Sequence, residues 1–330
     1  MVDAKSVVTK KAVGLKFYDA SFVNEYGKIE SLRAQRYNSS FSLVLMNLES
    51  SDKRTTDNDT VELIKRMSGS VLDSMRTCDV VGLIEDRQVV AILPETDYFG
   101  SLIAIRKLSK TVSSCIAKEN MPYSAVLSQA TFPKDGKGYG ALLSTASKRM
   151  QDKKESIWEK REFKDKLFWE IIADITNTSI TGFDNATYEA GGGNQLNENF
   201  IDQVNELILK EVMQSPYKRG ILYIVSKKVN GSNPVVNSLS HVGSLSTKVF
   251  LVGQVEDNLR DIKNASPLFL DDPRLRESFF TFYLTEDSGY AMICKENWGS
   301  TFSCFHTADK YLVDGLIHKF QIEYVLQEQL

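Results

Sequence analysis

The chain is poor in the side chains that most often bind metal ions. Its 330 residues include three histidines and four cysteines. The cysteines form no CxxC pair and no cluster with histidine, so a histidine-rich metal site is excluded and we expect no metal ion or cofactor. The cysteines are Cys78, Cys115, Cys294 and Cys304. Cysteines scattered in this way are typical of reduced thiols in a cytoplasmic protein, and we predict four free thiols.

Long apolar runs and an excess of positive charge are also missing. The longest apolar runs are far shorter than the roughly 20 residues that a membrane-spanning helix requires. Residues 1–14 lack the continuous apolar core of a secretory signal. The net charge is −3, which gives no general attraction for nucleic acid. We therefore expect a cytoplasmic protein that has no membrane span and binds no nucleic acid.

The length and composition are those of a globular protein with two domains. Hydrophobic residues make up 42% of the chain and charged residues 25%, which is typical of soluble proteins, and 330 residues exceed one ordinary core. In the first half, helical patterns at about 19–37, 59–75, 98–118 and 139–155 alternate with strands at about 41–48, 79–84, 88–93 and 124–131. The interior order βαββαβ predicts an α+β fold, an antiparallel sheet with helices on one face.

The second half restarts with a different order of elements. Helical patterns cover about 198–214 and 308–327, and strand-like runs cover 220–226, 249–255, 279–284, 290–295 and 302–305. Residues 285–289, Thr-Glu-Asp-Ser-Gly, have the composition of a hairpin turn between two of these strands. This pattern predicts an α/β domain of the size of a sensor over residues 181–330.

Between the halves lies a charged segment with apolar residues at helical spacing. Residues 151–175 contain no glycine or proline, and Ile157, Trp158, Phe163 and Leu167 belong to one apolar stripe. The pattern predicts one long amphipathic helix, which either pairs with a second copy in a homodimer or docks on its own domains. Docking is favoured because fewer than four clean heptads are present. The expected domain limits are an extension at 1–15, a first domain at 16–155, a linker helix at 156–180 and a second domain at 181–330.

The most informative stretch is RTCDVVGLIEDRQVVAILPET at residues 76–96. Its two short aliphatic runs, 80–84 and 89–93, are typical of buried strands. Residues 85–88 form a polar turn that is long enough only for a hairpin, and Pro94 ends the second strand because it cannot donate to a ladder. A strand–turn–strand hairpin is therefore predicted here.

This hairpin resembles the GGDEF domain of diguanylate cyclases, which join two GTP molecules into cyclic di-GMP. Leu93-Pro94-Glu95-Thr96 stand where that family has LPET after its hairpin. The resemblance covers roughly residues 15–155, and its further matches are Tyr18-Asp19, Phe22, residues 30–37, Phe41–Met46, Leu127–Pro133 and Ala141–Lys153. It implies the antiparallel βαββαβ sheet that nucleotide-cyclase palms share.

The departures from this family concern the catalytic turn. The positions of its signature hold Glu85, Asp86, Arg87, Gln88 and Val89. Glycine lets phosphates approach the backbone, whereas Glu85 and Asp86 add bulk and negative charge. The family's two metal-binding acids fall at Arg87 and Asn47, which cannot neutralise a metal–phosphate centre as carboxylates do. The resemblance therefore implies a degenerate site with no catalytic residues, and we expect no cyclase activity.

A second motif of the family is retained. Arg76-Thr77-Cys78-Asp79 matches its Arg-x-x-Asp product site, with five residues between the motif and the signature. An arginine fork suits phosphate or a guanine edge, and a carboxylate accepts from guanine N–H groups. The resemblance implies further help from Lys107, with Arg106 beside it. Alternatively, Arg76 and Asp79 only end the helix predicted before them.

The C-terminal half resembles the DICT sensory domain found beside GGDEF modules. The matches are Ser266-Pro267-Leu268, the hairpin Phe279–Glu296, the segment Phe305–Asp309 and Leu312-Val313. Together the resemblances suggest a catalytically inactive bacterial signalling protein, a cyclic di-GMP receptor or regulatory adaptor with a sensory or interaction domain. The rival hypothesis is a scaffold that binds protein partners without any nucleotide. Hydrolysis of GTP by a surviving enzyme is the third hypothesis.

Overall fold

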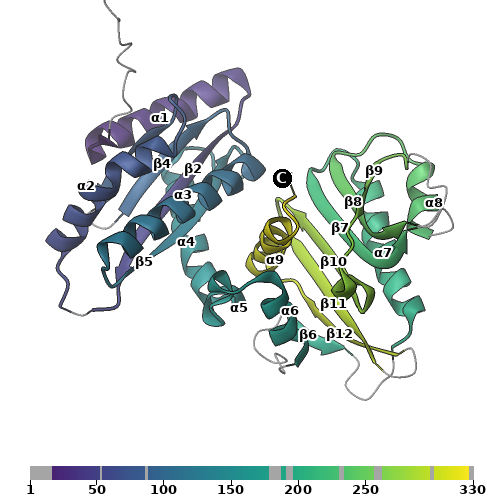
Figure 1. Cartoon of the computed structure of the whole chain (residues 1–330). Coiled ribbons are helices and arrows are strands. Elements are labelled where there is room, and N and C mark those ends of the chain that lie inside the picture. Colours follow the sequence, from purple (N-terminus) through teal and green to yellow (C-terminus); the bar gives the residue numbers. More distant parts are fainter. Residues whose placement is uncertain are drawn as a thin grey trace, which may run out of the picture. The chain divides into compact units, whose positions relative to one another are not determined.

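The computed structural model describes residues 17–52, 54–85, 88–177, 187–190, 196–229, 234–255, 262–297 and 301–326. The chain divides into two compact units, Met1–Asp152 and Lys153–Leu330 (Figure 1). Among the described residues, no helix combines the length and apolarity needed to cross a membrane.

The first unit is built on a five-stranded sheet. Its strands are β1 (Phe17–Tyr18), β2 (Phe41–Ser50), β3 (Val80–Glu85), β4 (Gln88–Pro94) and β5 (Tyr123–Phe132), in the order β1-β3-β4-β2-β5. The pairs β3–β4, β4–β2 and β2–β5 are antiparallel, and only the two-residue β1 runs parallel to its neighbour. The predicted antiparallel βαββαβ core is confirmed, and so is the predicted hairpin.

Helices cover both faces of this sheet, so the expectation of helices on one face is wrong. The helices are α1 (Ala20–Tyr37), α2 (Asp57–Asp73), α3 (Tyr98–Glu119) and α4 (Tyr139–Glu155). Side chains of α2 and α3 share one core cluster, and side chains of α1 and α4 share the other. The physical reason lies in β2, where six consecutive residues, Phe41–Met46, are all buried. A strand that is apolar at successive positions has to be covered on both faces.

The second unit contains a seven-stranded mixed sheet. Its strands are β6 (Thr187–Ala190), β7 (Gly220–Val229), β8 (Thr247–Val255), β9 (Ala265–Phe269), β10 (Ser278–Thr285), β11 (Gly289–Asn297) and β12 (Thr301–Thr307). They are ordered β6-β12-β11-β10-β7-β8-β9, and β7, β8 and β9 are mutually parallel. The predicted hairpin is confirmed as β10–β11.

Helices also cover both faces of the second sheet (Figure 1). On one face, α7 (Glu198–Gln214) and α8 (Pro234–Ser240) pack against β7, β8 and β10. On the other face, α9 (Lys310–Glu323) brings Phe320 against Phe280, Phe282 and Phe168 at ring-centroid distances of 5.3–6.3 Å. Aromatic edge-to-face contacts of this kind build the centre of the core.

The linker is not the single long helix that we expected. After α4 ends at Glu155, the chain forms α5 (Ile157–Lys160), the 3₁₀ helix η1 (Phe163–Asp165) and α6 (Phe168–Asn177). Ser156 Oγ donates to Asp309 Oδ2 at 2.6 Å and accepts from the N–H of Trp158. Glu162 adopts the left-handed conformation with φ 53°, which interrupts the helix.

Most of the apolar stripe of the linker packs into the core of the second unit. Ile157, Trp158 and Phe163 are buried, and the Trp158 ring occupies the space that a side chain at Gly315 of α9 would need. The docking alternative therefore holds for these three side chains, whereas Leu167 of the same stripe is 65% exposed.

Two of the four cysteines are not free thiols, contrary to our prediction. Cys294 on β11 and Cys304 on β12 lie directly opposite each other, with 4.1 Å between their Cα atoms, and are joined by a disulfide. Cys78 and Cys115 are free. The pairing follows from the register of two strands, which the spacing of the cysteines alone does not reveal.

Candidate ligand-binding site

The β3–β4 hairpin separates the predicted site residues into two groups. The Arg76–Asp79 turn precedes β3, and the degenerate turn follows it. Because β3 has six residues, its ends lie about 17 Å apart at the usual rise of a strand. The two groups therefore form two separate places on the first unit.

At the degenerate end, Asn47 of β2 lies opposite Gln88 of β4 in the antiparallel register. Both residues continue the α1 and α4 face of the sheet, because their strand neighbours two positions away, Leu45 and Val90, belong to that core. Asn47 Nδ2 donates to Glu49 Oε1 at 3.2 Å. Of the residues predicted to form the degenerate active site, the structure thus brings two neutral amides together, Asn47 and Gln88.

The rest of the degenerate turn is described only in part. The backbone of Glu85 pairs with that of Gln88, whereas the side chain of Glu85 and the residues Asp86 and Arg87 lie outside the described residues. Within the part of the chain that the structure describes, no cluster of three or more His, Cys, Asp or Glu side chains could hold a metal ion.

At the other end, Arg76 and Asp79 form a closed turn between α2 and β3. The N–H of Asp79 donates to the carbonyl of Arg76 at 3.0 Å, and Asp79 Oδ2 accepts from the N–H of Arg76 at 2.7 Å. Asp79 is 5% exposed, whereas Arg76 is exposed. The carboxylate of Asp79 thus has a structural partner in the backbone of Arg76. This turn follows the helix and does not cap it, because α2 stops at Asp73 and its C-cap is Ser74.

Lys107 of α3 completes a cluster of charges around this turn. Burial raises the pKa of Asp79 above its ordinary value, although the N–H of Arg76 and the positive charges of Arg76 and Lys107 lower it. Lys107 is exposed, and its neighbour Arg106 is partly buried. Because successive helical residues point about 100° apart, these two side chains do not face the turn together. The positive charges of Arg76 and Lys107 thus both act on the carboxylate of Asp79. A part for Arg106 in this site stays a prediction.

The helix α1 adds residues to this end of the sheet that the sequence interpretation missed. Burial raises the pKa of Tyr26, and the charges of Glu30, Cys78 and Asp79 raise it further, so its hydroxyl lies near the turn. The buried Glu30 carboxylate accepts two hydrogen bonds from Arg33, at 2.6 and 2.8 Å. A Glu-x-x-Arg pair on one helix is too common to indicate a site.

Arg33 forms ion pairs with two carboxylates of its own chain. Besides Glu30, its Nη2 contacts Glu95 Oε1 at 2.9 Å. No ion pair of this kind involves Arg76 or Lys107 among the described residues. These two cations are therefore the groups at this end of the sheet that can meet an anionic ligand.

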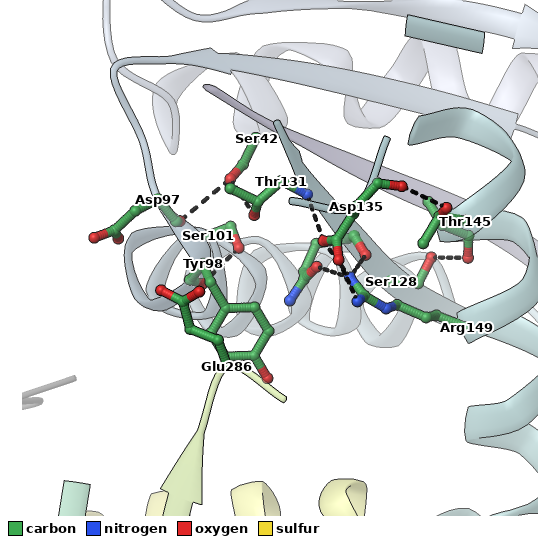
Figure 2. Close-up of polar contacts among 12 residues, drawn as sticks. Ser42, Asp97, Tyr98, Ser101, Ser128, Thr131, Asp135, Thr145, Arg149 and Glu286 are labelled. Carbon is green, nitrogen blue, oxygen red and sulfur yellow. Dashed lines mark hydrogen bonds and ion pairs between the residues drawn. The ribbon is translucent and has the colours of Figure 1, made fainter. Parts of the chain in front are cut away.

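A second polar cluster in the first unit serves the fold (Figure 2). Arg149 of α4 forms two hydrogen bonds of 2.7 Å with Asp135, and its Nη1 also donates to the carbonyl and Oε1 of Gln129. Asp135 Oδ2 accepts from the N–H of Thr131 at 2.8 Å. This network fixes α4 to the end of β5. Arg149 lies 14 residues from Asp135, and no sequence motif marks the pair.

The second unit has a surface cavity that no predicted residue lines. It has a volume of about 610 Å³, and its walls are Phe269, Leu270, Asp271, Asp272, Pro273, Arg274 and Tyr324. Asp272 accepts from Arg274 and from the Tyr324 hydroxyl, which lowers its pKa to about 2. The Arg274 guanidinium lies 4.6 Å from the centre of the Trp169 ring. Asp272 and Arg274 are thus paired with each other, and Asp271 pairs with Arg276 outside the cavity wall at 3.3 Å.

Of the comparisons with known proteins, only the one with solved structures finds similar chains. No family model matches the chain, and no curated protein matches it. The chain is similar to a DGC protein from Thermotoga maritima, with 11% identity, a TM-score of 0.32, and coverage of 42% of this chain and 95% of that chain. It is also similar to the FimX GGDEF domain from Pseudomonas aeruginosa, with 11% identity, a TM-score of 0.35, and coverage of 43% and 93%.

A third solved structure is the GGDEF domain of DgcB from Caulobacter crescentus in complex with c-di-GMP. It shares 9% identity with this chain at a TM-score of 0.32, over 44% of this chain and 92% of that chain. At this level of similarity, the likeness does not establish that the chain belongs to a family.

Proposed function

We propose that the first unit is a non-catalytic receptor for cyclic di-GMP, which binds at Arg76, Asp79 and Lys107. The observation that supports this proposal is a buried Asp79 carboxylate, held by the N–H of Arg76 at 2.7 Å, whose pKa the charges of the exposed Arg76 and Lys107 lower. An anion that also presents hydrogen-bond donors matches this arrangement, because the cations suit phosphate and the carboxylate suits N–H groups. The phosphates and guanine edges of cyclic di-GMP provide both.

Each side chain has a separate task in this proposal. The Arg76 guanidinium gives paired hydrogen bonds to a phosphate or to the guanine edge, and Lys107 adds a point charge. Asp79 Oδ2 is held by the N–H of Arg76, which leaves Oδ1 to accept from guanine. Within the part of the chain that the structure describes, Oδ1 is contacted by the Cys78 thiol at 3.9 Å, and a thiol is a weak donor.

The absence of catalysis is part of the proposal and rests on the other end of the hairpin. Asn47 stands where a cyclase of the resembled family needs a metal-binding acid, and it lies opposite the neutral Gln88 of the degenerate turn. Amides do not balance the charge of a metal–phosphate centre as carboxylates do. We therefore expect binding without turnover of GTP.

Binding transmits a signal only if the ligand prefers one of two states. A tenfold change in the ratio of two states requires a difference in binding free energy of about 1.4 kcal/mol. The second unit, or a protein partner bound to it, is where we expect the change to be read. The protein would then act as a receptor or a regulatory adaptor in a signalling pathway.

Calorimetric titration of the full chain with cyclic di-GMP tests this function. We expect saturable binding in the micromolar range that Arg76→Ala and Lys107→Ala each remove or strongly weaken. Lys65→Ala is the matched control, because Lys65 is exposed on α2 and lies eight residues, about 12 Å along the axis, before the helix ends. No binding to the folded wild type would refute the receptor proposal.

A scaffold without a nucleotide is the second candidate, and the burial of Asp79 favours it. Asp79 is 5% exposed and satisfies its own turn, so the Arg-x-x-Asp pattern has a structural use without any ligand. If the protein is a scaffold, Arg76→Ala leaves its partner binding intact. If it is a receptor, the same change removes the nucleotide response of that binding.

A further inference from the structure

The solvent-facing side of α1 carries large apolar side chains. Phe22 is 43% exposed, Ile29 is 60% exposed and Leu32 is 67% exposed. Single exposed apolar residues are common on protein surfaces. These three belong to one helix of 18 residues, where the outward side is expected to be polar.

The exposed residues form one stripe along the helix. At 100° per residue, Phe22, Ile29 and Leu32 lie within an arc of about 80°, and the same arc contains Glu25 and Arg36. The buried residues of α1, among them Val23, Gly27 and Ala34, lie on the opposite side and face the sheet. We call Phe22, Glu25, Ile29, Leu32 and Arg36 the α1 stripe.

We propose that the α1 stripe binds the same stripe of a second copy of the chain, with the two α1 helices antiparallel. A twofold axis between Ile29 and Leu32 places Ile29 of one copy opposite Leu32 of the other. The same axis places Glu25 opposite Arg36 of the second copy, twice in the dimer. Unlike charges at both ends of an apolar centre make the stripe complementary to itself, as a twofold interface requires.

The charges nearest to the stripe determine this alignment. Arg33 is held by Glu30 and Glu95, so it is not the cation that meets Glu25. Arg36 instead lies over the ring of Tyr37 at 5.5 Å and is exposed. On the flank of the antiparallel pair, Lys28 lies near Gln35 of the second copy, which avoids a contact between like charges.

The contacts that the dimer would replace are weak. Glu25 pairs with Lys28 at 2.7 Å, and both side chains are more than 60% exposed. Exposed ion pairs contribute little to stability because water competes with them. When Glu25 changes its ion-pair partner from Lys28 to Arg36 of a second copy, little free energy is therefore lost. The burial of Ile29 and Leu32, which leave water on dimerisation, favours the dimer.

The size of the stripe limits the strength of the dimer. A helix of 18 residues is about 27 Å long, and one pair of such helices buries less than a standard protein interface. We therefore expect a reversible dimer with a dissociation constant of about 100 µM, which appears only in concentrated solutions.

Sedimentation velocity of the full chain from about 1 µM to about 500 µM tests the proposal. We expect the weight-average sedimentation coefficient to rise with concentration, and Ile29→Asp to weaken dimerisation by at least about tenfold. Leu207→Asp is the matched control. Leu207 is 67% exposed, close to the 60% of Ile29, but it belongs to α7 of the second unit. A wild-type chain that stays monomeric over the whole range overturns the proposal.

Charge reversal tests the antiparallel alignment separately. Glu25→Arg places two arginines opposite each other and Arg36→Glu places two glutamates opposite each other, so each single variant should dimerise at least about tenfold more weakly. The double variant restores two unlike pairs and should recover dimerisation. A dimer that ignores these changes, or one that the double variant weakens further, contradicts the alignment. Because both residues are exposed, loss of folding does not explain either outcome.

Discussion

The two ends of the β3–β4 hairpin carry different chemistry. Where β3 begins, Arg76 and Lys107 place positive charge near the carboxylate of Asp79. Where β3 ends, Asn47 and Gln88 are neutral amides that face each other across two strands. The ends are about 17 Å apart, so a ligand at one end requires nothing from the other. Under the proposed function, the difference teaches that a fold can keep charges suited to binding an anion while it lacks those suited to reacting with it.

The largest expected effect comes from removing the carboxylate that both the fold and the site use. Asp79→Ala leaves the N–H of Arg76 without the acceptor that it has at 2.7 Å. We expect the free energy of unfolding to fall by about 1–3 kcal/mol and cyclic di-GMP binding to disappear. Urea denaturation and calorimetry measure the two quantities. A variant that is destabilised but binds normally would show that Asp79 has only the structural role.

The next largest effect distinguishes the role of the two cations from that of the carboxylate. Arg76→Ala and Lys107→Ala each remove a charged partner of the ligand, which should weaken binding by about 1.5–3 kcal/mol. Both side chains are exposed, so the free energy of unfolding should change by less than about 0.5 kcal/mol. Equal losses of affinity in Lys65→Ala would show that overall charge attracts the ligand and would contradict a defined site.

The sequence predicts more of this fold than of this site. The four helices of the first unit, α7, α9 and the long strands are predicted correctly, because helical periodicity or an apolar run such as Phe41–Met46 marks them. The short helix α8 and the two-residue strand β1 were missed. The short strands β6 and β9 were missed, since both lie at edges of the sheet and β9 contains Pro267, so neither shows a clear apolar pattern. An interrupted linker was missed because its break depends on Asp309, which lies far along the chain from Ser156.

The site residues were predictable only as far as a motif marked them. Arg76, Asp79 and Lys107 are named from a resemblance, and in the structure the charges of both cations act on the carboxylate of Asp79. Tyr26 is not marked by any motif, because its influence on the site depends on how α1 packs. The hydrogen bond from the N–H of Arg76 to Asp79 depends on the conformation of the turn, which the four letters of the motif do not reveal.

The pH dependence gives a smaller effect that differs between folding and binding. Burial raises the pKa of Asp79 from its ordinary value of 3.8. Its contribution to stability is therefore fully present below pH 3.8 and is lost as the pH rises through the folded-state pKa. Binding has the opposite sign, because only the ionised carboxylate is a pure acceptor for guanine N–H groups. We expect the affinity to fall as the pH falls through that pKa.

Asp79→Asn is the control for this pH dependence. Its amide oxygen still accepts from the N–H of Arg76, but the side chain does not titrate. Calorimetry from about pH 7 to about pH 4.5 should show an affinity that falls with pH in the wild type. The variant presents an NH₂ donor to the guanine N–H groups, so it should bind more weakly at every pH, with a flat profile. The same slope in both proteins would assign the pH dependence to another group.

The smallest effect is expected at the amide end, and it tests whether the two ends are independent. Asn47→Asp places a carboxylate within reach of Glu49, whose Oε1 now accepts from Asn47 at 3.2 Å. Repulsion between these partly exposed acids should lower the free energy of unfolding by about 0.5 kcal/mol. Asn47 lies at the far end of the hairpin from Asp79, and the ends of β3 are about 17 Å apart. The new charge is therefore beyond the Debye length of roughly 8–10 Å. Cyclic di-GMP affinity should therefore change by less than about twofold.

The same variant tests whether a single added acid restores turnover of GTP. Turnover of GTP needs a metal centre that several groups hold together, and one aspartate opposite Gln88 does not provide it. We expect no product from GTP and Mg²⁺ with either the wild type or Asn47→Asp. A change in cyclic di-GMP affinity of more than tenfold would mean that the hairpin couples its two ends. Catalysis and binding would then have to be explained as properties of one site.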